Sequence, residues 1–247
     1  MSILAKLRAE NVSARPYILV MGKSSAGKTT LAGTLPGKTL LISVRGKEFG
    51  AASAAAKAAE RGNSLVSVYA GSIAELLALA EELRTDTDFE NVVVDGYTAL
   101  TFLSADDPEI AKVLEGKTGN VFAAYDKIRN DIAKIHKAFA DLTYAATAKK
   151  PKVVCFTLAV DTKTDASGSA IEMVPVLKGR ASLAEFTRPA PTIVSLAARQ
   201  TENGLERIML TSNAGHYVAR VNGILDEVNP KVIEPDLSKL LSLMETK

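Results

Sequence analysis

Short, mostly apolar runs alternate with segments of helical period along the first two thirds of the chain. The apolar runs are bounded by polar or glycine residues, which indicates buried strands, and they cover residues 17–21, 39–44, 65–69, 91–95 and 152–158. An alanine-rich segment at 50–61 and a segment at 72–83, which opens with the capping-box pair Ser72 and Glu75, indicate helices. This alternation predicts an α/β fold with a mainly parallel sheet and helices on both faces.

The clearest helical period lies at residues 121–142. Apolar side chains recur there at spacings of four and three: Val121, Tyr125, Ile128, Ile132, Ile135, Phe139 and Leu142. A single stripe next to a strand predicts a helix that faces the core, with a coiled-coil partner as the alternative. We interpret His136, beside the stripe, as a structural residue. The preceding segment, 101–120, has no clear period, and we expect it to contain a loop.

The pattern changes after residue 158, where residues 161–169 are polar and predict an exposed turn. Strand-like segments follow at 171–177, 191–198, 206–211 and 216–221. The last two flank Asn213-Ala214-Gly215, which predicts a C-terminal β-hairpin. We expect an N-terminal arm at 1–15 and a tail at 222–247 with a short helix at 236–244. Without an internal repeat or a clear linker, the simplest prediction is one domain over residues 1–247.

The composition of the 247 residues, 47% hydrophobic and 23% charged, is typical of a soluble globular protein. A net charge of +2 argues against a protein that coats nucleic acid by bulk charge, so any such site must be a local patch. The only cysteine, Cys155, lies in an apolar run and predicts a buried thiol. No run approaches the ~20 apolar residues of a membrane span, and the N-terminus lacks a signal-peptide pattern. We expect a cytoplasmic protein without a membrane segment.

Residues 22–30 match G-x-x-x-x-G-K-[ST], the pattern of a phosphate-binding loop (P-loop), between a strand and a helix-compatible segment. The residues of this P-loop are Gly22, Lys23, Ser24, Ser25, Ala26, Gly27, Lys28, Thr29 and Thr30. Backbone amides of such a loop surround phosphate groups, and glycines permit the close approach. We expect Lys28 to reach the β- and γ-phosphates of a nucleotide and the Thr29 hydroxyl to bind Mg²⁺.

Asp95 ends the apolar strand 91–95 and is our candidate for the second metal-shell residue, because a P-loop needs a carboxylate at the end of a neighbouring strand. Hydrolysis also needs a group that orients or deprotonates the attacking water. Gly96 occupies the position where some P-loop ATPases carry a glutamate. The remaining acidic candidate near a strand end is Glu48, with a solvated loop glutamate as the alternative. The candidate catalytic residues are therefore Lys28, Glu48 and Asp95.

The P-loop is not the only part of the chain that resembles a known group of proteins, and the similarity covers about residues 12–240. Besides the P-loop, the similar segments are 15–17, 35–42, 93–100, 125–130, 178–181 and 219–220. Together they resemble the RecA-like P-loop ATPases of bacteriophages, which include single-strand annealing proteins related to RecA. The resemblance implies a RecA-type core in which strand 152–158 lies between the P-loop strand and the Asp95 strand. It also implies ATP and Mg²⁺ as cofactors and a homo-oligomer, either a ring or a filament. The work implied is on single-stranded DNA in recombination, annealing or replication, in the host cytoplasm if a phage encodes the chain.

Members of this group usually carry acidic residues at the end of the second strand, where this chain has Ser43-Val44-Arg45. The departure leaves two readings open, a slow ATPase and a nucleotide-gated scaffold that does not hydrolyse ATP. A small-molecule kinase on the same P-loop is a third alternative. Kinases usually show an arginine-rich lid, and the sequence contains no compact arginine cluster.

The resemblance places DNA contacts in two segments, 101–124 and 161–185. Residues 147–188 contain seven basic and four acidic residues, a modest positive balance. From position and sign we expect Lys163, Lys178 and Arg180 to contact DNA phosphates, with a solvated surface loop as the alternative. Arg180 and Arg220 have a second expected role as interface arginines that reach the γ-phosphate of a neighbouring subunit. An ordinary surface arginine is the alternative there.

Overall fold

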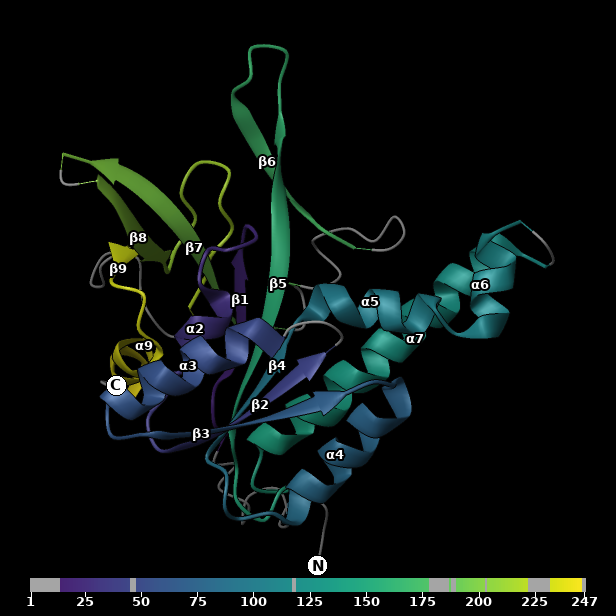
Figure 1. Cartoon of the computed structure of the whole chain (residues 1–247), viewed down its shortest axis with the longest axis horizontal. Helices are drawn as coiled ribbons and strands as arrows, with labels where there is room; N and C mark the ends of the chain where they lie inside the picture. Colours follow the sequence, from purple (N-terminus) through teal and green to yellow (C-terminus); the bar gives the residue numbers. More distant parts are fainter. Residues whose placement is uncertain are drawn as a thin grey trace, which may run out of the picture.

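In the part of the chain that the structure describes, nine strands form one sheet. The sheet lies at the centre of the fold (Figure 1). The computed structural model describes residues 14–44, 48–116, 119–177, 187, 190–202, 204–221 and 232–245, without the side chains of Glu48 and Phe49. Within these ranges the strand order is β3-β2-β4-β5-β1-β7-β8-β9, and β6 pairs with β5. The strands are β1 (Tyr17–Gly22), β2 (Lys38–Val44), β3 (Ser64–Ala70), β4 (Asn91–Asp95), β5 (Val153–Thr164), β6 (Ala170–Pro175), β7 (Thr192–Thr201), β8 (Gly204–Leu210) and β9 (Val232–Ile233).

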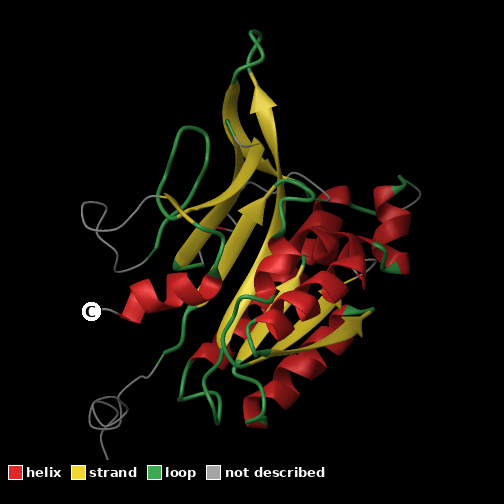
Figure 2. Cartoon of the chain, turned by 60° about the vertical axis from the view of Figure 1, so that its left-hand side comes forward, coloured by secondary structure: helices red, strands yellow, loops and turns green. Residues whose placement is uncertain are grey.

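Helices cover both faces of this sheet (Figure 2). They are α2 (Lys28–Ala32), α3 (Glu48–Glu60), α4 (Ile73–Thr85), α5 (Tyr97–Ala105), α6 (Pro108–Leu114), α7 (Val121–Ala140), the 3-10 helix η1 (Asp141–Thr143) and α9 (Leu237–Glu245). Helices α4 to α7 bury residues such as Leu76 and Ile135 against one face. Helices α2, α3 and α9 bury Leu31, Ala54 and Leu240 against the other. The central strands are covered on both sides, which explains their continuous apolar sequence.

The predicted fold class is confirmed. Strands β3, β2, β4, β5, β1 and β7 pair in parallel, whereas β8 and β9 extend the sheet in antiparallel fashion. Strand β5 lies between β1 and β4, as expected for the segment 152–158. Because the strands are parallel, the P-loop after β1 and Asp95 at the end of β4 meet at the same edge of the sheet.

Helix α7 contains most of the predicted apolar stripe. Ile128, Ile132, Ile135 and Phe139 are buried, but Val121 at its start is 41% exposed. The segment 101–120 contains loop residues before and after α6, as predicted, but its described part also contains the end of α5 and all of α6, which the sequence pattern did not indicate. The sequence did carry a start signal for α6: the Asp107 carboxylate accepts hydrogen bonds from the amides of Glu109 and Ile110, and proline follows at position 108.

Two β-ribbons differ from the predicted pattern. Strand β5 continues to Thr164 and pairs with β6, so that a two-stranded ribbon extends well beyond the helices (Figure 1). The C-terminal hairpin joins β7 to β8, not 206–211 to 216–221. Residues 214–221 contribute only the isolated bridges Ala214–Tyr217 and Ile193–Arg220 within the described chain. Strand β8 has its partner in β7 because the turn lies before Gly204, whose φ of 114° suits glycine.

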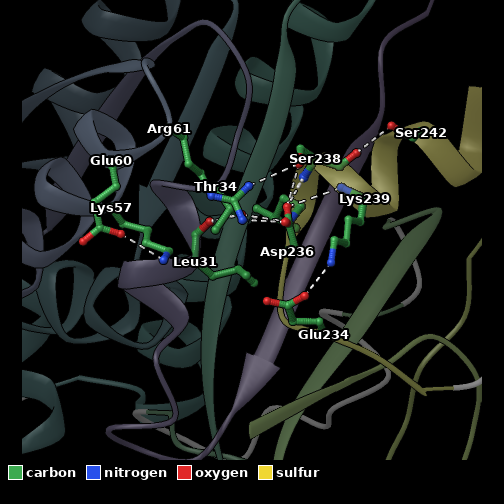
Figure 3. A network of polar contacts seen from close by, with 11 residues as sticks. Leu31, Thr34, Lys57, Glu60, Arg61, Glu234, Asp236, Ser238, Lys239 and Ser242 are labelled. Atoms are coloured by element: carbon green, nitrogen blue, oxygen red, sulfur yellow. Dashed lines mark hydrogen bonds and ion pairs between the residues drawn. The ribbon is translucent and has the colours of Figure 1, made fainter.

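Helix α9 is fastened beside the P-loop helix by the network in Figure 3. The Asp236 carboxylate accepts a 2.6 Å hydrogen bond from Arg61 and further bonds from the first turn of α9. Burial raises the pKa of Asp236, but the hydrogen bonds from Arg61 and Ser238 outweigh it and leave that pKa below its usual value. The amide of Leu237 donates to Thr34 Oγ1, just after α2. The C-terminal part of the described chain therefore supports the P-loop helix. None of the described helices is long and apolar enough to cross a bilayer.

Candidate functional site

The loop between β1 and α2 adopts a conformation that favours glycine at two positions. Gly27 has φ 94° and ψ 17°, a left-handed conformation that glycine adopts without cost. A Cβ on Gly22 would stand 3.1 Å from the carbonyl oxygen of Leu196 on β7. Within the described chain, no backbone oxygen accepts from the amides of Ser24, Ser25 or Gly27. These amides are available to anionic oxygens, as a phosphate cradle requires.

Lys28 folds back over this loop. Its Nζ donates to the carbonyl oxygens of Gly22, at 2.8 Å, and Lys23, at 2.7 Å. The side chain is buried with 7% exposure, so its charge depends on these oxygens for solvation. A phosphate oxygen in the loop would offer the ammonium group a stronger, charge-assisted partner.

Asp95 is completely buried between two threonine hydroxyls from different elements. Thr29 Oγ1, at the start of α2, donates to Asp95 Oδ2 at 2.5 Å. Thr157 Oγ1, on β5, donates to Asp95 Oδ1 at 2.5 Å. The peptide bond from Asp95 to Gly96 is cis. The structure thus places the two predicted metal-shell residues in direct contact and fixes the carboxylate through a third residue.

The oxygen atoms at this point suit Mg²⁺. Thr29 and Asp95 offer hard oxygen donors, and the buried Ser43 hydroxyl, in register with Asp95, has no hydrogen-bond partner among the described residues. No group of three or more His, Cys, Asp or Glu side chains in the described ranges could hold a metal by itself. Mg²⁺ does not need one, because waters and substrate phosphates fill most of its octahedral shell. The residues present fit a nucleotide-bound Mg²⁺.

Glu48 is the first residue of α3, but its side chain lies outside what the structure describes. The helix itself lies against the site: a Cβ on Gly50 would stand 2.6 Å from Thr29 Cγ2. The Thr30 hydroxyl also lies 2.9 Å from that of Ser53 on α3. The backbone of Glu48 therefore begins a helix that packs on the metal-shell threonine. Its catalytic role stays a prediction.

Lys163, which the sequence predicts to contact DNA, does not lie at this edge of the sheet. Lys163 lies six residues beyond Thr157 on β5, about 20 Å along the strand, and pairs with Glu172 at 3.9 Å. Lys178 and Arg180 lie outside the described residues, as does Arg45. Lys152, one of the seven basic residues counted near this region, is fully buried. The DNA contacts of Lys163, Lys178 and Arg180 stay predictions.

Arg220 is engaged within its own chain. Its Nη2 donates to the carbonyl oxygens of Thr187 and Ala190, and its backbone bridges to Ile193. These bonds fasten the segment before β7 to the segment after β8. The contacts account for Arg220 as a structural residue, and the interface role remains a prediction.

Sequence reasoning missed Thr157, although a signal was present. It is the single hydroxyl in the buried part of β5, residues 153–158, and the next residues on both sides are apolar and buried. Neighbouring Cys155 is inert: burial, and in second place the charge of Asp95, raises the pKa of its thiol far above the usual value.

A comparison with protein families agrees with this geometry. Residues 14–221 match a family model described as an AAA domain. A search of curated proteins found no match. The family match covers most of the chain and includes the P-loop, Asp95 and Thr157. It indicates a nucleotide-binding protein. The chain therefore belongs to the AAA-domain family of P-loop NTPases.

Proposed function

We propose that the protein binds ATP with Mg²⁺ at residues 22–30 and hydrolyses it slowly. The observation that carries this proposal is the hydrogen bond from Thr29 to Asp95 at 2.5 Å. It joins the P-loop to a carboxylate on a second strand, the pairing that Mg²⁺–nucleotide binding needs. Thr29 and Asp95 would hold Mg²⁺, which would supply positive charge to neutralise the charge that develops during phosphoryl transfer.

The chain's own residues have distinct roles in this proposal. The amides of the P-loop and the Lys28 ammonium group bind the phosphates, and Asp95 orients Thr29 for the metal shell. Glu48, at the start of α3, is the candidate that orients the attacking water.

The test is ATP hydrolysis and nucleotide binding by the purified full chain, with Lys28→Ala and Asp95→Asn as variants. We expect binding with Mg²⁺ that Lys28→Ala weakens at least tenfold, and turnover that both variants abolish. Glu48→Gln should keep binding and lose turnover. Equal binding by the wild type and by Lys28→Ala would remove the basis of the proposal.

We further propose that the protein is a RecA-like phage protein acting on single-stranded DNA as a single-domain homo-oligomer. The support is the resemblance described above, and one sheet that contains strands from both halves of the chain. The described β5–β6 ribbon, residues 160–175, contains one lysine and three acidic residues, so it does not itself attract phosphates. Turnover measured with and without single-stranded DNA tests this part, and unchanged turnover and no DNA binding in either nucleotide state would refute it.

A nucleotide-gated scaffold is the second candidate function. It is favoured by the strand ends around the site, where Ser43 and Gly96 stand at positions that carry acidic residues in related ATPases. In that case the wild type binds ATP tightly, and neither it nor Glu48→Gln shows turnover. The same measurements therefore decide between the two functions.

A further inference from the structure

Arg207 lies on the face of the sheet that carries the P-loop helix. In the β7–β8 pair it stands opposite Ala198, two residues from Met209, which stands opposite Leu196. Met209 and Leu196 pack in the same apolar cluster as Leu31 of α2. Side chains two residues apart on a strand share a face. The Arg207 side chain therefore lies on the face of the β7–β8 pair that α2 covers, at the edge of the sheet where β1 ends and the P-loop begins.

The Arg207 side chain reaches the P-loop itself. Its Cδ, Nε and Nη1 atoms lie 3.9, 4.0 and 4.0 Å from where a Cβ on Gly27 would stand. Gly27 directly precedes Lys28, so both cations lie beside the same turn of backbone. Because β1 lies between β5 and β7, Arg207 approaches from the side of the loop opposite to Asp95 and Thr157.

No residue of the described chain compensates the charge of Arg207. Within those ranges it has neither an ion pair nor a hydrogen bond, and the side chain is exposed. The neighbouring carboxylate, Glu206, points to the other face and is bound by Arg199 at 2.5 Å. A cation held beside a P-loop without a carboxylate partner is placed to meet an anionic ligand.

We propose that Arg207 binds a phosphate group of the nucleotide held by residues 22–30, and so acts within the same chain as a second cationic ligand beside Lys28. This inference rests on the proposed function, because it requires a nucleotide in the P-loop. Thr29 and Asp95 would hold Mg²⁺, which supplies positive charge on the β4–β5 side of the loop, and Arg207 supplies positive charge from the β7–β8 side. The planar guanidinium group can donate two parallel hydrogen bonds to one phosphate, which a lysine cannot.

The test is equilibrium binding of a fluorescent ATP analogue and its ADP counterpart, each with Mg²⁺, to the full chain. Arg207→Ala should weaken binding of the triphosphate about tenfold to a hundredfold, as expected for a charge-assisted hydrogen bond. Arg207→Lys should recover only part of the loss. Arg199→Ala is the matched control: it removes a cation from the same ribbon but from the opposite face, and should change affinity less than about twofold.

Three results separate this inference from the proposed function. If the wild type and Lys28→Ala bind equally, the proposed function itself fails. If Lys28→Ala loses affinity while Arg207→Ala behaves like Arg199→Ala, only the role of Arg207 is overturned. A large loss in Arg207→Ala supports it, provided that thermal unfolding of the variant matches the wild type. Arg207→Gln serves as the second variant should Arg207→Ala unfold early.

Discussion

Thr29 and Asp95 are 66 residues apart in the sequence, yet the threonine hydroxyl donates a 2.5 Å hydrogen bond to the aspartate carboxylate. The second carboxylate oxygen accepts from Thr157. Both oxygens of a fully buried carboxylate are therefore occupied by hydroxyl groups that position it. The metal-shell pair is preorganised by the fold, which reduces the rearrangement that binding of a Mg²⁺–nucleotide requires.

Thr157 should consequently matter for metal affinity although it lies on β5, outside the P-loop. Thr157→Val keeps the size of the side chain but leaves Asp95 Oδ1 without its donor. We expect unfolding free energy to fall by about 1–3 kcal/mol and a higher Mg²⁺ concentration to be needed for ATP binding. Urea unfolding and a Mg²⁺ titration of nucleotide binding measure the two effects.

Thr157→Ser is the matched control for this experiment, because serine keeps the donor and loses only a methyl group. It should retain near-normal Mg²⁺ dependence. A Thr157→Val protein with normal Mg²⁺ dependence would show that Asp95 does not rely on Thr157 for its orientation.

Lys152 should stabilise the fold and play no part in ligand binding. It is fully buried, and its Nζ donates to the carbonyl oxygens of Asp86 and Phe89 and to the Asp86 carboxylate. Lys152→Met removes all three bonds and leaves the partly buried carbonyl oxygens of Asp86 and Phe89 without this donor, so we expect a loss of about 2–3 kcal/mol of unfolding free energy.

Lys150→Ala provides the comparison for that variant. Lys150 lies in the same loop and also bonds a carbonyl, that of Thr87, but it is partly exposed. Its removal should cost less than about 1 kcal/mol. Equal losses in urea unfolding for the two lysines would contradict the role assigned to Lys152.

The central sheet and the P-loop could be predicted from sequence because each depends on local pattern. Strands β1, β2, β4 and β5 are buried on both faces, so their apolar runs are continuous, and the P-loop has a fixed spacing. Asn213-Ala214-Gly215 predicts the hairpin turn at the wrong place, because these residues follow β8. The dipeptide Asn203-Gly204 is a stronger hairpin signal, and in the sequence it stands after the end of β7, with Gly204 as the first residue of β8.

Apart from the meeting of Thr29 and Asp95, which the P-loop pattern predicts, contacts between distant residues were beyond prediction from a single sequence. The local sequence around Arg207 does not predict that its side chain reaches Gly27. The position of Arg207 depends on the strand order, in which β7 and β8 join the sheet beside β1. The same is true of Thr157, whose role follows from the register of β5 against β4. Sequence patterns identified elements and one loop, while the partners of each site residue depended on strand order and register.

His136 should make the protein sensitive to acid. Its Nδ1 lies 2.8 Å from the Tyr17 hydroxyl and 3.1 Å from that of Tyr97, and burial lowers its pKa to about 4. Burial also raises the pKa of both tyrosines, which therefore remain protonated and neutral. Because the folded pKa lies below the usual 6.5, the unfolded state binds more protons between pH 6.5 and 4. The contribution of His136 to the unfolding free energy is therefore fully present above pH 6.5 and is lost as the pH falls through this window.

Urea unfolding at pH 7 and pH 5 should reveal a loss of about 2 kcal/mol from this group. His136→Gln cannot titrate, so the difference between the two pH values should shrink even though the variant is less stable at pH 7. An unchanged pH dependence in His136→Gln would assign the acid sensitivity to other groups.

Ser43 offers a test of whether the site keeps an unsatisfied group for its ligand. The hydroxyl is buried, stands in register with Asp95, and has no hydrogen-bond partner among the described residues. An unpaired buried hydroxyl is a cost of about 1 kcal/mol or more to the ligand-free fold. A water of the Mg²⁺ shell would satisfy it, so the cost is recovered when the nucleotide binds. Ser43→Ala should therefore raise the melting temperature of the ligand-free protein by a few degrees and reduce the further rise caused by Mg²⁺ and ATP. A variant that melts like the wild type with and without ligand would show that Ser43 has no part in the site.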